Sequence, residues 1–135
     1  MARTPRIPAA IVALMARDDR HAWTLEDLHA GLARAGAATD FSSVFRAAER
    51  LVADGAVHKL TLEDGRASFE AASAHHDHLH CTGCGRLVAV PCVLPRRTLK
   101  ALEARTGIAV SEHRVIFKGL CPLCRKARRG KKTRA

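Results

Sequence analysis

Two cysteine pairs with the spacing Cys-x-x-Cys constrain this chain more than any other feature. Cys81 and Cys84 form the first pair, and Cys121 and Cys124 form the second. Two thiolates separated by two residues can bind one metal ion from a single tight turn, and Gly85 permits the backbone conformation of that turn. The two pairs together predict a closed tetrahedral shell of four sulfur atoms, which is the coordination of a structural zinc site.

Two other interpretations of these cysteines remain open, a redox pair and two unrelated pairs. A redox Cys-x-x-Cys motif usually occurs singly and opens a helix after a strand, so a shared ion explains the pattern better. The sequence between the pairs has room for a strand, a helix and a strand. A zinc ion would therefore join the two ends of a small α/β unit.

The charge balance of the chain favours nucleic acid as a partner. The net charge is +10, from 23 Lys and Arg against 13 Asp and Glu, and such a balance suits acidic partners. Residues 125–135 contain seven basic residues and no acid, and removing these seven lowers the charge from +10 to +3. We expect residues 125–135 to be a disordered tail that adds non-specific, salt-sensitive affinity for DNA.

The sequence indicates neither a membrane segment nor secretion. Hydrophobic residues make up 47% of the chain, enough for a folded core, but no apolar run is long enough to span a bilayer. The first residues lack the apolar core of a signal peptide. We expect a cytoplasmic protein, because reduced Cys-x-x-Cys pairs bind metal there more often than they form disulfides.

The first 70 residues predict a winged helix-turn-helix DNA-binding domain. Helical periodicity and capping residues indicate helices near 7–15, 24–36 and 42–53. Alternating apolar residues at 56–62 and 66–70, joined by an Asp-Gly turn, predict a β-hairpin. Three short helices followed by a hairpin make a winged helix.

The second half of the chain predicts a smaller α/β domain at 75–124. Apolar runs at 87–90 and 110–117 indicate strands, and the pattern at 95–105 indicates a helix. The small residues at 71–74 are interpreted as a hinge. The expected fold class is therefore α+β, with two domains.

Four of the eight histidines lie in the six residues before the first cysteine pair. On an extended segment the side chains alternate between faces, so His76 and His78 point one way and His75 and Asp77 the other. This arrangement predicts two half-sites for metal. His80 has no obvious partner, and we interpret it as a surface residue or as a neighbour of the ligands.

The segments His75–Arg86 (HHDHLHCTGCGR) and Gly119–Cys124 (GLCPLC) resemble the ferric uptake regulator (Fur) family of metal-responsive repressors. Ser43–Arg46 (SVFR) resembles the Thr-Val-Tyr-Arg type sequence of that family's recognition helix. The resemblance implies an N-terminal winged helix, a C-terminal dimerisation domain and a homodimer that binds palindromic operator DNA when loaded with metal.

The resemblance also implies a regulatory metal at the hinge. Its ligands would be His76 and His78, with Glu70 from the second strand of the wing. The segment Gly-Ala-Val before His58 resembles the zinc uptake regulators, in which a ligand follows the same step. His58 is therefore the fourth expected ligand, and a surface histidine on a strand is the alternative for it.

The chain departs from the family pattern in ways that favour zinc. Iron and peroxide sensors commonly carry a histidine two residues before the second helix, where this chain has Ala22, with His21 one step away. A carboxylate that the family often places after the first cysteine pair is replaced by Ala89 or Arg96. Three imidazoles and one carboxylate suit four-coordinate Zn²⁺, whereas Fe²⁺ and Mn²⁺ prefer more oxygen-rich shells and are the alternatives.

A second regulatory site is implied on the opposite face, with His75, Asp77 and His113 as ligands. The family completes this site with an acid, and Arg96 stands at that place. Cys92 is the unpaired fifth cysteine. It is either a buried apolar residue, the common fate of a free cysteine, or an extra thiolate ligand.

The third helix would enter the major groove of DNA. Ser42 and Ser43 could bind phosphate at its N-terminus, Arg46 could bind a base or phosphate, and Phe45 could touch a thymine methyl group. Lys59 on the wing suits a backbone contact. For each basic residue a solvated charge is an equally good interpretation.

Two rival functions differ from a metal-dependent repressor. An enzyme is disfavoured, because the chain has neither the His-x-Glu and Pro-Cys-x-x-Cys motifs of zinc deaminases nor a catalytic triad pattern. A constitutive nucleic-acid-binding module would hold one structural zinc and show no response to metal.

Overall fold

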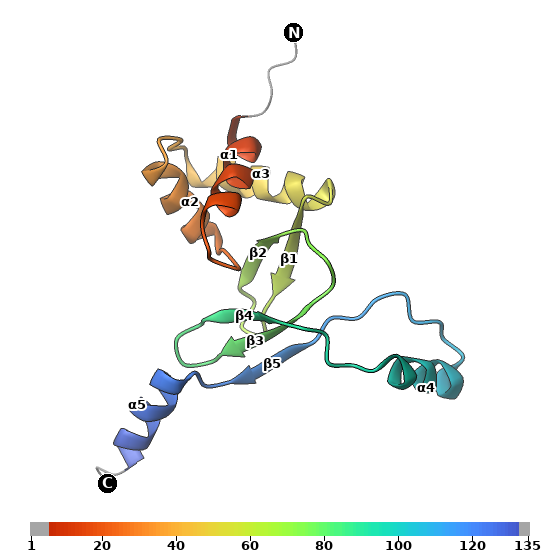
Figure 1. Cartoon of the computed structure of the whole chain (residues 1–135). Coiled ribbons are helices and arrows are strands. Elements are labelled where there is room, and N and C mark those ends of the chain that lie inside the picture. Colours follow the sequence, from red (N-terminus) through yellow and green to blue (C-terminus); the bar gives the residue numbers. More distant parts are fainter. Residues whose placement is uncertain (1–5, 133–135) are drawn as a thin grey trace. The chain divides into compact units, whose positions relative to one another are not determined.

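The computed structural model describes residues 6–132 and divides the chain between Ser73 and Ala74 into two units (Figure 1). Residues 1–5 and 133–135, the outer ends of the expected first domain and of the expected tail, lie outside the described residues. No described helix is long and apolar enough to cross a membrane.

The first unit is a winged helix. It contains three helices, α1 (Arg6–Arg17), α2 (Leu25–Arg34) and α3 (Phe41–Ala53), and an antiparallel hairpin of β1 (Val57–Thr61) and β2 (Ala67–Ala71). The expected helices and strands are all present. The fold class predicted from the sequence is thus confirmed for this half.

Polar side chains fix where the second and third helices begin. Thr24 and Asp27 form a capping box at α2, in which each side chain accepts a 3.0 Å hydrogen bond from the backbone N–H of the other residue. Asp40 caps α3 by accepting a 2.9 Å hydrogen bond from the N–H of Ser43. These caps fix the first turn of each helix, and the buried residues of both helices show that their apolar stripes face the core.

The core of the first unit is made of apolar side chains from all three helices and the hairpin. Trp23 and Phe69 are its largest fully buried members, and they also pair as an isolated antiparallel bridge. The N–H of each donates to the carbonyl oxygen of the other, at 2.8 Å and 2.7 Å. The segment before α2 is therefore attached to β2.

The second unit is a three-stranded sheet with two helices. Its elements are β3 (Asp77–Cys81), β4 (Leu87–Val90), α4 (Arg96–Thr106), β5 (Ile116–Gly119) and α5 (Pro122–Lys132). The strand order is β4-β3-β5, with β3 antiparallel to β4 and parallel to β5. In Figure 1, α4 stands apart from the strands at the end of two long connections, and none of its residues is buried.

Two segments of the second unit differ from the sequence-based expectation. The strand expected at 110–117 is confined to Ile116–Gly119, and the preceding residues form an irregular connection. The disordered tail expected from Arg125 is instead helical as far as Lys132. Arg, Lys and Ala favour helix, so a run of charge alone does not exclude one.

Candidate metal centres

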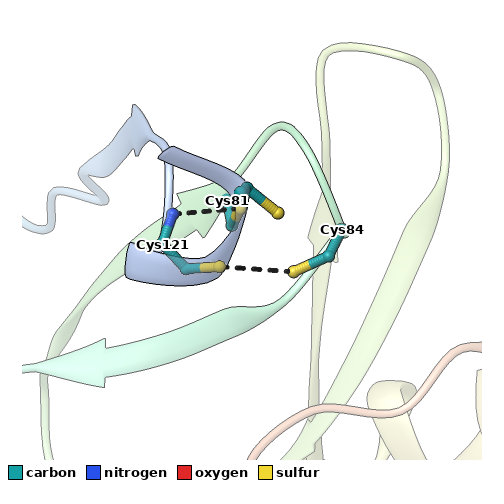
Figure 2. Close-up of side chains that lie close together, drawn as sticks. Cys81, Cys84 and Cys121 are labelled. Atoms are coloured by element: carbon teal, nitrogen blue, oxygen red, sulfur yellow. Dashed lines mark hydrogen bonds between the residues drawn. The ribbon is translucent and has the colours of Figure 1, made fainter. Parts of the chain in front are cut away.

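The four cysteines of the two pairs meet at one end of the three-stranded sheet. Cys81 is the last residue of β3 and pairs in register with Gly119 at the end of β5, so the two chain segments leave the sheet together. Cys84 follows in the turn after β3, Cys121 immediately precedes α5, and Cys124 lies in its first turn. The four sulfur atoms lie within 4.8 Å of one another. Figure 2 shows three of these cysteines, Cys81, Cys84 and Cys121, close together.

The sulfur geometry fits one tetrahedral ion. The Sγ atoms of Cys84 and Cys121 are 4.0 Å apart, and all of these cysteines are free thiols. A zinc ion with Zn–S bonds of about 2.3 Å places its sulfur ligands roughly 3.8 Å apart. The prediction that both pairs share one site is therefore consistent with the structure.

Backbone amides and neighbouring sulfurs shift the pKa values of the thiols in opposite directions. The N–H of Cys121 donates to Cys81 Sγ at 3.3 Å, which is the main reason that the pKa of Cys81 is lowered to about 6. The neighbouring sulfurs, Cys121 foremost, raise the pKa of Cys124 to about 12. A divalent cation at the centre would offset the repulsion between neighbouring thiolates, and a thiol that coordinates such an ion is deprotonated.

Gly83 is required by the close packing of the turn against α5. A Cβ atom at Gly83 would lie 2.7 Å from Cys124 Sγ and 2.8 Å from its Cβ. No real Cβ approaches another atom so closely, so a larger residue here would displace the Cys124 ligand. This requirement comes from space alone and was not visible in the sequence.

A second cluster lies at the other end of the same sheet. His75 and Asp77 enter β3, Cys92 follows β4, and His113 precedes β5. Their ligand atoms lie within 4.8 Å of one another. His113 Nε2 is 2.9 Å from His75 Nε2 and 3.3 Å from Cys92 Sγ. The structure thus brings together the three residues predicted for the second regulatory site and adds Cys92 to them.

Two further histidines are adjacent in the same unit. The rings of His76 and His78 have their centroids 4.7 Å apart, and His78 is buried. His76 Nδ1 lies 2.9 Å from the carbonyl oxygen of Ala74, which fixes Nδ1 as the protonated nitrogen and Nε2 as the ligand atom. These two residues form the half-site that alternation along an extended segment predicted.

The first unit contains a buried carboxylate that faces imidazoles. Glu70 on β2 is 3% exposed, and its Oε2 is 2.5 Å from His21 Nε2. His58 is the register partner of Glu70 across the hairpin, but its Nδ1 is 3.9 Å from the carboxylate. His21, which the sequence analysis did not select, is thus the nearer imidazole, brought there by the Trp23–Phe69 bridge.

Four of the predicted DNA-contacting residues lie on α3 and the fifth, Lys59, lies on β1; Ser43 and Lys59 already have acidic partners. Phe45 and Arg46 are exposed, with Phe45 47% accessible. The hydroxyl of Ser43 donates to Asp40 at 2.7 Å, so Ser43 is part of the helix cap. Lys59 forms a 2.7 Å ion pair with Glu49, so a phosphate would have to compete for it.

A winged helix followed by a sheet that gathers cysteine, histidine and carboxylate ligands defines a class of metal-dependent DNA-binding regulators. A sequence model of the Ferric uptake regulator family matches residues 3–118. The chain therefore belongs to the ferric uptake regulator family, and it is a metal-responsive transcriptional regulator of that family.

Individual relatives and solved structures agree with this assignment. A ferric uptake regulation protein of Legionella pneumophila is 27% identical over 121 residues, covering 89% of this chain and 88% of the relative. The crystal structure of the Vibrio cholerae ferric uptake regulator matches with a TM-score of 0.78 at 22% identity, covering 88% of this chain and 92% of that one. A zinc uptake regulator solved with zinc and DNA matches with a TM-score of 0.65 at 22% identity, covering 95% and 87%.

Proposed function

We propose that this chain is a zinc-responsive repressor of metal-uptake genes that binds operator DNA as a homodimer. One zinc ion is held by the four cysteines and is structural. A second, exchangeable zinc ion is bound by Glu70 and an imidazole of the first unit together with His76 and His78 of the second.

The observation that carries the proposal is the buried carboxylate of Glu70 beside His21. A carboxylate at 3% exposure is costly unless a cation or hydrogen bonds compensate it. Only residues 71–75 separate Glu70 from His76, so the two half-sites are close along the chain. One carboxylate with three imidazoles is a four-coordinate set that suits zinc better than iron or manganese.

An ion shared by both half-sites would couple metal to DNA affinity through chain entropy. Without the ion, the hinge leaves the winged helix of each protomer free to move. Ordering the two winged helices of a dimer on an operator is then entropically unfavourable. With the ion that ordering has already occurred, so DNA affinity rises. Thermodynamic linkage then requires operator DNA to tighten zinc binding by the same factor.

Two features support the DNA and dimer parts of the proposal. Phe45 and Arg46 are exposed on α3, where a recognition helix needs side chains that can reach bases. The second unit exposes large apolar side chains on its strands, its helices and its connections, a surface that a second copy of the chain would cover. They include Leu79, Val88, Val93, Leu102, Ile108 and Phe117.

The test is operator binding measured against free metal, after operators have been selected from a random pool of double-stranded oligonucleotides. His76→Ala should abolish the zinc-dependent gain in DNA affinity while the dimer and the cysteine-bound zinc are retained. His80→Ala is the matched control, because His80 lies on β3, four residues after His76, but in none of the ligand groups of the described residues. A His76→Ala variant that responds fully to zinc would overturn the site.

Two further comparisons decide the fourth ligand and the metal. If His21 is the ligand, His21→Ala weakens the zinc response and His58→Ala leaves it largely intact; the reverse result assigns His58. Parallel titrations with Zn²⁺, Fe²⁺ and Mn²⁺ test the metal. Activation by Fe²⁺ or Mn²⁺ at lower free concentration than Zn²⁺ would refute zinc sensing but keep the regulator.

A further inference from the structure

The cluster of His75, Asp77, Cys92 and His113 has a donor set of its own. We infer that Cys92 supplies a thiolate to an ion held there by His75, Asp77 and His113, and that this thiolate makes the site selective for zinc over iron and manganese. The inference rests on the proposed function, since it concerns a third ion of the same regulator. It is independent of the exchangeable site at His76 and His78.

Sheet topology explains why these four residues meet. β3 and β5 are parallel, so the segments that enter them carry His75, Asp77 and His113 to the same end of the sheet. β4 is antiparallel to β3, with Val90 opposite Asp77, so the chain leaves β4 at that same end and reaches Cys92. Three separate chain segments therefore bring these four residues to one place.

The buried carboxylate of Asp77 supports a cation at this place. The residue is 0% exposed, and neither carboxylate oxygen has a hydrogen-bond partner among the described residues. The imidazole of His75 lies beside it, but its Nε2 is 3.6 Å from Oδ1, which is too long for a hydrogen bond. An uncompensated buried carboxylate is strongly unfavourable, and a bound metal ion satisfies it.

The other three ligand atoms lie too close together for one proton to give each neighbouring pair a hydrogen bond. His113 Nε2 is 2.9 Å from His75 Nε2 and 3.3 Å from Cys92 Sγ. One proton on His113 Nε2 could serve one of these two neighbours. An ion at the centre would accept the lone pairs of both imidazoles, the thiolate and the carboxylate at once.

The thiolate decides which ion the site prefers. Soft thiolate ligands favour zinc, whereas carboxylate and water ligands suit manganese. Two nitrogens, one oxygen and one sulfur make four ligands, which is the number that a tetrahedral zinc ion takes. An acid in place of Cys92 would give a harder site with less discrimination between zinc and manganese.

Cobalt is the probe that tests this assignment, because Co²⁺ bound to thiolate has an ultraviolet charge-transfer band that cobalt bound only to nitrogen and oxygen lacks. The full chain is loaded with zinc, treated with a mild chelator that leaves zinc on the four cysteines, and titrated with Co²⁺. The wild-type chain should develop the charge-transfer band while its cysteine-bound zinc, measured by elemental analysis, stays constant.

Three variants give the expected pattern. Cys92→Ser should lose the band and bind cobalt at this site at least about 10-fold more weakly. Cys92→Asp should also lose the band, but retain visible cobalt absorption and show a smaller preference for Zn²⁺ over Mn²⁺ in competition. His113→Ala should lose the band as well, because the thiolate alone does not hold the ion.

The results that overturn the inference are equally definite. A band that persists in Cys92→Ser would come from the other cysteines, and one that persists in His113→Ala would show adventitious binding to an isolated thiol. Absence of the band from the wild-type chain also refutes it. Retained cysteine-bound zinc and Trp23 fluorescence show that each variant is folded, and the His76→Ala operator assay judges the proposed function separately.

Discussion

The buried residues of the first unit are mostly apolar, whereas those of the second unit are candidate metal ligands. Ile11, Leu28 and Phe69 are fully buried in the first unit, among a core drawn from five elements. In the second unit the buried residues among those described are Asp77, His78 and Cys81, all three of which are candidate metal ligands. We therefore expect the first unit to fold by burying apolar surface, and the second to depend on the proposed ions and partner copy.

The largest expected effect comes from removing the metal from the four cysteines. Structural zinc contributes about 10–16 kcal/mol of binding free energy in small domains, as much as most domains have in total stability. A strong chelator, or the double variant Cys84→Ser and Cys121→Ser, should unfold the second unit. Far-ultraviolet circular dichroism measures the loss of structure.

The control is the single tryptophan of the chain. Trp23 is 1% exposed in the core of the first unit, so its fluorescence reports that unit alone. We expect the buried emission of Trp23 to survive chelation. A shift of Trp23 to solvent-exposed emission together with the loss of circular dichroism would show that the contrast between the units is wrong.

A core truncation should produce the opposite pattern. Phe69→Ala removes a fully buried aromatic side chain of the first unit, at a typical loss of about 3–5 kcal/mol. The thermal midpoint measured by Trp23 fluorescence should fall sharply, while one zinc per chain remains bound. Release of that zinc at the lowered midpoint would argue against independent stability.

A smaller effect is expected from Gly83→Ala, which pushes a methyl group against the Cys124 ligand. Overpacking of this kind typically costs about 1–3 kcal/mol, or roughly 5–150-fold in zinc affinity. Competition with a chromophoric chelator measures the change. Gly119→Ala is the matched control, since a Cβ at Gly119 meets no atom within 4 Å; equal losses in both variants would refute the steric explanation.

The smallest expected effect is on the capping box of α2. Thr24→Ala should destabilise the first unit by about 1 kcal/mol, which lowers its thermal midpoint by roughly 4–8 °C. Burial opposes ionisation of Asp27, but hydrogen bonds from Thr24 outweigh it and lower the pKa below the ordinary 3.8. The stabilisation is therefore present above pH 3.8 and lost as the pH falls through the lowered pKa.

This sign gives the cap prediction its own check. In the wild-type chain the Trp23-monitored midpoint should decline below pH 3.8, and Thr24→Ala should flatten that decline. The zinc content of the second unit should not change between the two proteins at neutral pH. An unchanged acid profile would mean that the cap contributes nothing measurable.

The parts of the molecule that follow from local patterns were predictable from the sequence. Helical periodicity and the Asp-Gly turn predicted the winged helix, and two Cys-x-x-Cys spacings predicted the cysteine site. The contact of His21 with Glu70 was not, because it depends on the Trp23–Phe69 bridge. A single pair of residues far apart in sequence leaves no periodicity to detect.

The second cluster was predictable only in part, for a similar reason. Alternation placed His75 and Asp77 on one face, but the approach of Cys92 to His113 depends on the order of strands in the sheet. The prediction of a disordered basic end was wrong, because the helix propensity of its residues, and not their charge, determines the backbone of α5. Composition describes what a segment tolerates, and it does not determine the segment's backbone.

The central strand β3 carries Asp77, His78 and Cys81, which belong to three different candidate centres. Because neighbouring side chains of a strand point to opposite faces, sliding β3 by a single residue would exchange Asp77 for His78 and withdraw Cys81 from the sulfurs. The register of β3 in the sheet thus determines which of its ligands belongs to which candidate centre. A substitution that weakens that pairing, even one remote from any ligand, would displace ligands from all three candidate centres at once.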